Sequence, residues 1–145
     1  SMAEHAVDKA VTTASLSKKN CQTATLKLHG ASVDYEASHL AVYGSDAVHI
    51  KNLMTPDTLL AEKIHPKYPY TKAEVVWMIE NEMAITVEDI LARRIRLLFL
   101  DAKAAMEAAP VVAQTMAAQL NADEAWMNGQ VQEFNNLARQ YTIAY

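Results

Sequence analysis

Glycine, proline and cysteine are scarce in this sequence. It carries 3 glycines, 4 prolines and 1 cysteine in 145 residues, whereas average usage is about 7% for glycine and about 5% for proline. The few glycines form neither a Gly-x-Gly-x-x-Gly nor a Gly-x-x-x-x-Gly-Lys-Ser/Thr loop for nucleotide phosphates. The single Cys21 allows no internal disulfide and no Cys-x-x-Cys metal site. We therefore expect no nucleotide chemistry from this chain alone, and a free thiol in a reducing compartment.

Basic charge and long apolar runs are also missing. The net charge is −4, whereas binding to nucleic acid normally requires a basic face, so we expect no nucleic-acid partner. No apolar run approaches the ~20 residues that span a bilayer, and the charged start lacks the apolar core of a signal peptide. The sequence therefore predicts no transmembrane segment and a cytoplasmic location.

Hydrophobic residues make up 51% of the chain, and alanine, the best helix former, is abundant. Apolar positions recur at helical spacing, which predicts an all-α fold: a compact bundle of about six helices with a short extended arm near the N-terminus. The length fits one domain, residues 1–145. Within it we interpret Ser1 as a tag remnant, 3–14 as a leading helix, 15–33 as an arm or loop and 34–145 as the helical bundle. We also expect the chain to open inside a longer protein.

Local signals place the individual elements. Alternating residues at 21–28 predict a short strand or extended arm. Helices are expected at 34–44, 48–54, 57–64, 72–84, 86–98, 101–120 and 123–141. Thr71 is expected to cap the helix that follows it, with Glu74 completing a capping box. Pro110 is expected either to kink its helix or to begin a new one.

The reactive side chains form no catalytic pattern. Five histidines are scattered without a His-x-x-x-His spacing, so we interpret them as surface residues rather than metal ligands. Glu88 and Asp89 fit the first turn of a helix better than a hydrolytic carboxylate pair. No serine lies in a Gly-x-Ser-x-Gly turn. The sequence therefore predicts no catalytic, cofactor-binding or metal-binding residue.

The most informative cluster is the arginine-rich run that follows Asp89. Asp89 and Arg93 are four residues apart, which predicts an ion pair on one helix face. Arg94 falls beside the apolar stripe, where burial requires a carboxylate partner, and Glu74 and Glu82 are the candidates. We favour a structural ion pair between helices over an anion-binding arginine, although the guanidinium fork also suits phosphate.

Two segments, 69–84 and 86–94, together follow the pattern YxxAEV…ExAxTxEDxLxRR. This pattern resembles the C-terminal domain of the flavin-dependent glycerol-3-phosphate dehydrogenase/oxidase family. The downstream segment LDAKAAMEAAPVVAQTMAAQL continues the resemblance, and the opening MAEHAVDKAV resembles the helix that leads into that domain. The resemblance covers nearly the whole chain and is weakest over 15–38.

The resemblance implies a parent enzyme that oxidises sn-glycerol 3-phosphate to dihydroxyacetone phosphate with FAD and passes electrons to quinone or oxygen. The FAD and substrate domains would lie upstream on the same polypeptide, so this fragment is expected to be inactive and free of FAD. We interpret the matching residues as a scaffold between helices: Glu74, Glu82, Asp89, Arg93 and Arg94. The parent is expected to be of the aerobic, quinone-linked type, in the cytoplasm or peripheral on the cytoplasmic membrane, and homo-oligomerisation is left open.

The single Cys21 argues against the anaerobic branch of that family, whose C-terminus is cysteine-rich. The DxDxDG calcium-binding loop found at the end of mitochondrial relatives is also missing. Two alternatives remain from the sequence: a free-standing helical interaction module, and an arginine cluster that contacts the substrate phosphate directly.

Overall fold

The computed structural model describes residues 1–31 and 38–142, and within these ranges it is helical and has no β-strand. The α-helices are α1 (Met2–Thr13), α2 (Ala47–Met54), α3 (Lys72–Glu82), α4 (Leu97–Leu100), α5 (Ala102–Leu120) and α6 (Glu124–Ala138). Three other elements are the 3₁₀-helices η1 (His39–Asp46) and η3 (Arg139–Tyr141) and the π-helix η2 (Asp89–Arg94). The predicted all-α class is confirmed.

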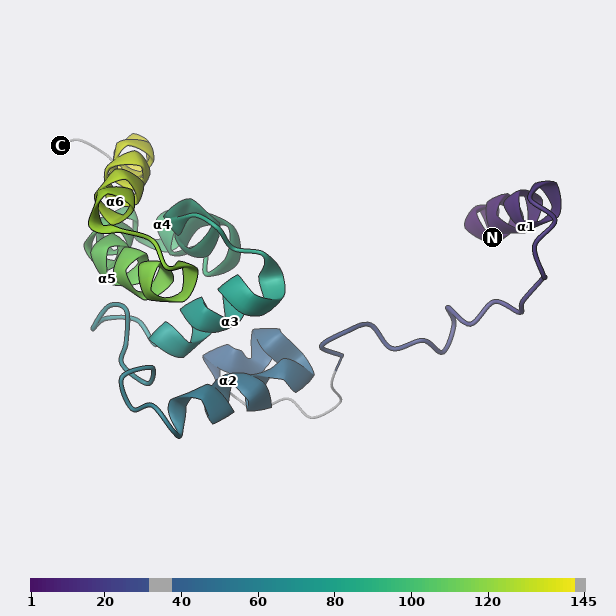
Figure 1. Ribbon diagram of the computed structural model, residues 1–145, viewed down its shortest axis with the longest axis horizontal. Helices are drawn as coiled ribbons and strands as arrows, with labels where there is room; N and C mark the ends of the chain where they lie inside the picture. The colour runs from purple at the N-terminus through teal and green to yellow at the C-terminus, as the bar shows by residue number, and fades with distance from the viewer. Residues whose placement is uncertain (32–37, 143–145) are drawn as a thin grey trace.

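The N-terminal helix α1 lies away from the bundle, at the end of a long connecting segment (Figure 1). A helix over 3–14 is thus confirmed, although none of its side chains is buried. Of the short strand or extended arm expected at 21–28, the strand does not form, because the segment finds no partner strand and contains a turn in which the Leu26 N–H donates to the Gln22 carbonyl at 3.0 Å. Residues 32–37, which include the start of the helix expected at 34–44, lie outside the described residues.

Two expected helices before α3 take other forms. The end of the 34–44 segment belongs to the 3₁₀-helix η1, and it is interrupted at Gly44, where φ is 55° and a Cβ would come within 1.7 Å of the Gly30 carbonyl oxygen. The helix expected at 57–64 is wrong. Its backbone instead pairs with the residues before α3, since the Ile64 N–H donates to the Tyr70 carbonyl at 3.0 Å. The Leu59 N–H donates to the Asp57 carboxylate at 2.9 Å, and this Asx turn favours a turn over a helix at the start of the segment.

The long helix α5 packs along α6 (Figure 1). Its packed faces are made largely of buried alanines, which allow close helix approach: Ala102, Ala104, Ala105, Ala108, Ala109, Ala113 and Ala117. α5 continues through the exposed Pro110, so of the two alternatives expected there, a kink or a new helix, the new helix does not occur. Asp123 caps α6, since its carboxylate accepts a hydrogen bond from the Trp126 N–H at 2.8 Å.

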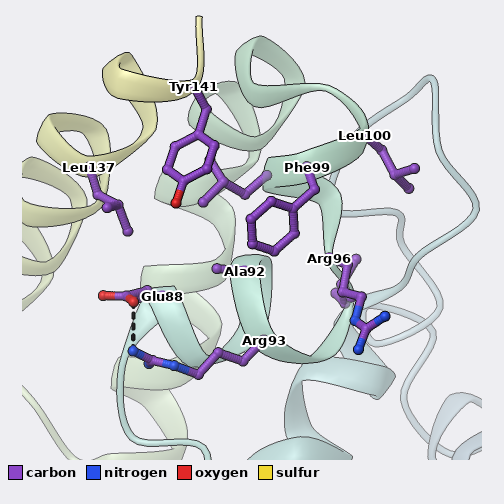
Figure 2. A pocket seen from close by; sticks show the side chains of 10 residues that line it. Glu88, Ala92, Arg93, Arg96, Phe99, Leu100, Leu137 and Tyr141 are labelled. Carbon is purple, nitrogen blue, oxygen red and sulfur yellow. Dashed lines mark hydrogen bonds and ion pairs between the residues drawn. The ribbon is translucent and has the colours of Figure 1, made fainter.

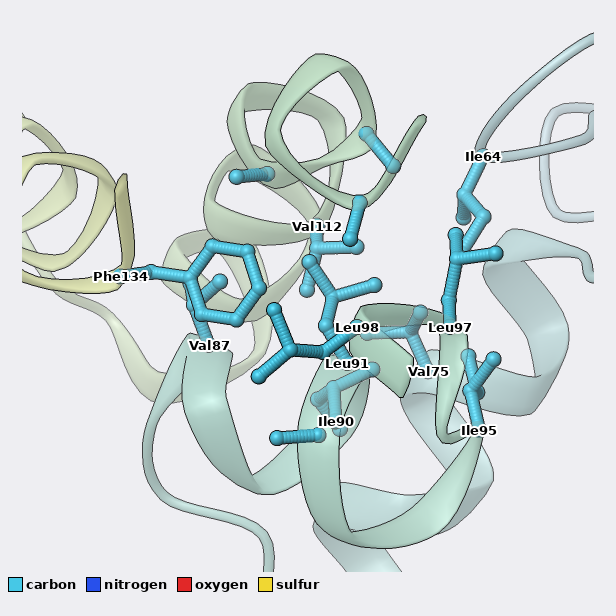
Figure 3. Packing of buried hydrophobic residues seen from close by; sticks show 14 of the residues in the cluster. Ile64, Val75, Val87, Ile90, Leu91, Ile95, Leu97, Leu98, Val112 and Phe134 are labelled. Carbon is cyan, nitrogen blue, oxygen red and sulfur yellow. The ribbon is translucent and has the colours of Figure 1, made fainter. Parts of the chain in front are cut away.

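The segment between α3 and α5 forms the centre of the core (Figure 3). Leu91 and Leu98 pack with Phe134 of α6, Val112 of α5 and Val75 of α3, and each of these side chains is at most 2% exposed. Full burial of such a side chain contributes about 1.5–3 kcal/mol. The segment that carries the arginine-rich run is therefore anchored, because its apolar side chains are buried in the core of the bundle.

Asp101 caps the start of α5, where its carboxylate accepts hydrogen bonds from Lys67 Nζ at 2.6 Å, Tyr68 Oη at 3.0 Å and the Ala104 N–H at 3.0 Å. Lys67, followed by the Ala104 N–H and the Tyr68 hydroxyl, holds the pKa of Asp101 well below its usual range. A lowered folded pKa stabilises the fold above the unfolded pKa of about 3.9, and this stabilisation is lost as the pH falls further.

We therefore expect the melting temperature to fall as the pH is lowered below about 4, and the Asp101→Asn variant to show a shallower fall. Asparagine is a suitable control because it caps helices about as well as aspartate does. Thermal unfolding of both proteins between neutral and acidic pH measures the difference. Parallel curves would remove Asp101 from the acid sensitivity of the fold.

Candidate functional site

The arginine-rich run forms the single π-helical turn η2, which we call the arginine turn (Asp89–Arg94). Its i to i+5 bonding continues where the Ile95 N–H donates to the Ile90 carbonyl at 2.9 Å. The start is fixed by reciprocal capping: Asp89 Oδ2 accepts from the Thr86 N–H at 3.0 Å, and Thr86 Oγ1 accepts from the Asp89 N–H at 3.1 Å. π-Turns inside helices are frequent at functional sites, so the neighbours of this one decide what it does.

Arg94 joins the arginine turn to the end of α3. Its Nε lies 3.4 Å from the Glu82 carboxylate, and its Nη1 donates to the Asp89 carbonyl at 3.0 Å. Its Nη2 donates to the Glu82 carbonyl, one of the last carbonyls of α3 that lack a partner within the helix. All three nitrogens of the guanidinium therefore bind groups of this chain, which leaves Arg94 little capacity for a phosphate.

Arg93 lies on the solvent side and is 57% exposed. It pairs with Glu88 at 2.6 Å and with Asp89 at 2.7 Å, so the structure contains the i, i+4 pair expected from the sequence. Burial acts to raise the pKa of Asp89, but hydrogen bonds from Ile85, Thr86 and Arg93 outweigh it and lower that pKa. Exposed pairs of this kind contribute about 0–1 kcal/mol.

Glu74 is the one buried carboxylate in the described ranges and is 1% exposed. It accepts hydrogen bonds from the Thr71 N–H at 2.8 Å, from Tyr43 Oη at 3.3 Å and from His39 Nε2, which lies at 3.0 Å. The pKa of Tyr43 lies far above its usual range. Burial of the hydroxyl is the main cause, and the negative charge of Glu74 is the second. The capping box expected from the sequence is present, but Arg94 pairs with Glu82 and not with Glu74.

Sequence reasoning missed His39 and Tyr43, which lie more than 30 residues before Glu74. It also misplaced two histidines on the surface. His65 is only 8% exposed and pairs with Glu107 at 3.0 Å, and His39 is held in the Glu74 cluster. One signal could have indicated these partners. Glu74 lies next to the apolar positions of its helix, and a carboxylate that is buried there needs hydrogen-bond donors.

Two clefts flank the arginine turn. One, of about 740 Å³, opens beside α4 and is lined by Phe99, Leu100, Leu137 and Tyr141 (Figure 2). The other, of about 530 Å³, lies over the Glu74 cluster and is lined by His39, Val42, Tyr43, Tyr70, Glu74 and Arg94. Arg93, Ile95 and Arg96 line both clefts and separate them.

Arg96 differs from the two arginines that precede it, Arg93 and Arg94. It is exposed, its φ is 61°, and no ion pair or hydrogen bond holds its guanidinium within residues 1–31 and 38–142. A left-handed conformation at a non-glycine residue costs roughly 1–2 kcal/mol. The link between the arginine turn and α4 therefore keeps the unpaired Arg96 at the surface despite a conformational cost.

No group of three His, Cys, Asp or Glu side chains that could hold a metal ion occurs in the described part of the chain. The site residues that the structure brings together, Glu82, Asp89, Arg93 and Arg94, are bound to one another or to the backbone, and Glu74 forms a separate cluster. No helix in residues 1–31 and 38–142 has both the length and the hydropathy of a bilayer-spanning segment.

Comparison with known proteins gives a consistent result. Residues 21–127 match a family described as the C-terminal domain of alpha-glycerophosphate oxidase. A probable mitochondrial glycerol-3-phosphate dehydrogenase of Caenorhabditis elegans is 33% identical over 154 residues, covering 91% of this chain and 21% of that protein. The mitochondrial glycerol-3-phosphate dehydrogenase of Homo sapiens is 32% identical over 145 residues, covering 86% and 20%.

A probable mitochondrial glycerol-3-phosphate dehydrogenase of Dictyostelium discoideum is 37% identical over 98 residues, covering 67% of this chain and 15% of that protein. The chain thus spans about a fifth of the length of the first two relatives. No solved structure matches.

Proposed function

Because this chain belongs to the family of C-terminal domains of alpha-glycerophosphate oxidases and glycerol-3-phosphate dehydrogenases, we propose that it is the non-catalytic helical cap of such an enzyme. The parent polypeptide would oxidise sn-glycerol 3-phosphate to dihydroxyacetone phosphate and deliver the electrons to quinone, or to oxygen in an oxidase. The cap would pack on the catalytic body and stabilise it.

One observation supports this role: Arg93 and Arg94 of the motif bind groups of this chain itself. Arg94 binds the Glu82 carboxylate and the carbonyls of Glu82 and Asp89, and Arg93 binds Glu88 and Asp89. A substrate phosphate would have to displace these partners before it could bind. The motif is therefore better suited to holding α3 against the arginine turn than to recognising a ligand.

The flavin of the parent does not fit this chain. A flavin dinucleotide needs a glycine-rich loop after a strand to bind its pyrophosphate, and Gly30, Gly44 and Gly129 stand in no such spacing. We place the FAD on the upstream part of the parent, together with the substrate. For the parent we propose a cytoplasmic location with peripheral membrane attachment; the names of the relatives place those proteins in mitochondria.

The purified chain is expected to be colourless, to leave FAD fluorescence unchanged in titration, and to reduce no artificial electron acceptor with glycerol 3-phosphate. Visible absorbance, flavin fluorescence and a dye-reduction assay measure these properties, and the parent polypeptide serves as the positive control. Stoichiometric flavin in the folded, purified chain would contradict the assignment of the flavin to the upstream part.

A further inference from the structure

Exposed apolar side chains gather at the cleft beside α4. Phe99, Leu100 and Tyr141 are 61%, 66% and 49% exposed, and the Phe99 and Tyr141 rings meet edge to face with centroids 5.6 Å apart (Figure 2). In the same short helix Leu97 and Leu98 are fully buried. α4 thus divides its large side chains between the core and the solvent, and such an exposed patch on a protein marks an interaction surface.

The rim of this cleft carries an unsatisfied charge. Arg93 is neutralised by Glu88 and Asp89, whereas the exposed Arg96 has no ion-pair partner within the described ranges. The chain as a whole has a net charge of −4. The apolar cleft is therefore bordered by a cation whose sign is opposite to that of the rest of the molecule.

A second copy of the chain complements this face poorly. In a two-fold interface the same patch meets itself, so Arg96 would lie among the arginines of the other copy, and the nearest rim carboxylate, Glu88, is already bound to Arg93. An acidic and apolar partner surface complements it well. The relatives are roughly five times as long as this chain. A parent of that length would supply a large partner surface on the same polypeptide.

We propose that this face, formed by Phe99, Leu100, Tyr141 and Arg96, docks on the catalytic body of the parent polypeptide. The body would insert apolar side chains into the cleft and place a carboxylate against Arg96. This inference rests on the proposed function and names the surface through which the cap acts. The apolar contacts would provide most of the binding, and the ion pair would fix the orientation of the cap.

Hydroxyl-radical footprinting read by mass spectrometry tests the proposal on the parent polypeptide and on this chain. Oxidation of Phe99 and Tyr141 is expected to be several-fold slower in the parent than in the isolated chain. Leu59, which is 61% exposed and lies away from the cleft, is expected to react equally in both and serves as the internal reference.

The alternative outcomes separate the two proposals. Protection of other surface residues while Phe99 and Tyr141 stay reactive overturns this surface but leaves the cap role intact. Equal oxidation of every residue in the two proteins contradicts both. Protection of Phe99 in the isolated chain that grows with its concentration assigns the face to a second copy and overturns the proposal.

Two substitutions of Arg96 in the parent test the charge, and one substitution of Lys103 serves as their control. Arg96→Glu is expected to lower the protection at Phe99 measurably, because a repelled carboxylate disturbs the orientation of the cap, whereas Lys103→Glu, which makes the same change of charge at an exposed position of α5, should leave it unchanged. Arg96→Gly removes the cation and suits the positive φ at this position, so it separates loss of the ion pair from loss of folding. Unchanged protection in both Arg96 variants would show that no carboxylate of the body pairs with Arg96.

Discussion

Replacing Arg94 with alanine is expected to lower the free energy of unfolding by about 2–3 kcal/mol. The Glu82 carbonyl and the Asp89 carbonyl would both lose their charged donor. The Glu82 carboxylate, which is 33% exposed, would lose its cation at the same time. Denaturation in urea, followed by helical circular dichroism, measures the change.

The neighbouring arginine provides a matched control. Arg93→Ala removes an equally large cation from the same turn, but Arg93 is 57% exposed, so the expected loss is below about 1 kcal/mol. Arg94→Lys should recover little, because an ammonium group cannot reproduce the planar fork that reaches three acceptors. Equal effects of the two alanine variants would mean that Arg94 contributes no more than a surface charge.

Glu74→Ala is expected to be the most destabilising of the proposed substitutions, by about 3–5 kcal/mol. It would leave the buried Thr71 N–H and the half-buried Tyr43 hydroxyl and His39 ring without their acceptor. The start of α3 and the attachment of η1 would be lost together, because the same carboxylate serves both. Urea denaturation also measures this change.

Glu80→Ala, on the exposed side of α3, is the control and should change the free energy of unfolding by at most about 0.5 kcal/mol. Glu74→Gln keeps the size and the acceptor oxygen, so its loss should lie between those of the two alanine variants. A Glu74→Ala protein as stable as the Glu80→Ala protein would show that the buried cluster contributes nothing to the fold.

The sequence predicts the fold best where short-range rules decide it. The capping box at Thr71 comes from residues three apart, and α3 begins directly after it. The helices expected at 101–120 and 123–141 begin within a residue of α5 and α6. Helical periodicity supplied the all-α class for the same reason. The prediction failed at 57–64, where the backbone forms successive i to i+3 turns and bonds to 70–73 instead of forming an α-helix. This pairing depends on the chain folding back.

The candidate site depends more on contacts between distant residues. The pair of Asp89 with Arg93 could be predicted, because four-residue spacing brings them together on a helix. The choice of Glu82 over Glu74 as the partner of Arg94 could not, since it depends on the π-turn and on how α3 ends. His39 meets Glu74 across 35 residues, and no local pattern indicates such a contact.

We propose that the arginine motif holds helices together and does not bind substrate. Steady-state kinetics of the full-length parent carrying Arg94→Ala, with its melting temperature measured on the same samples, tests this claim most directly. We expect a lower melting temperature and an unchanged KM for glycerol 3-phosphate in the folded enzyme. A sharply raised KM with an unchanged melting temperature would contradict the account and make Arg94 a phosphate ligand.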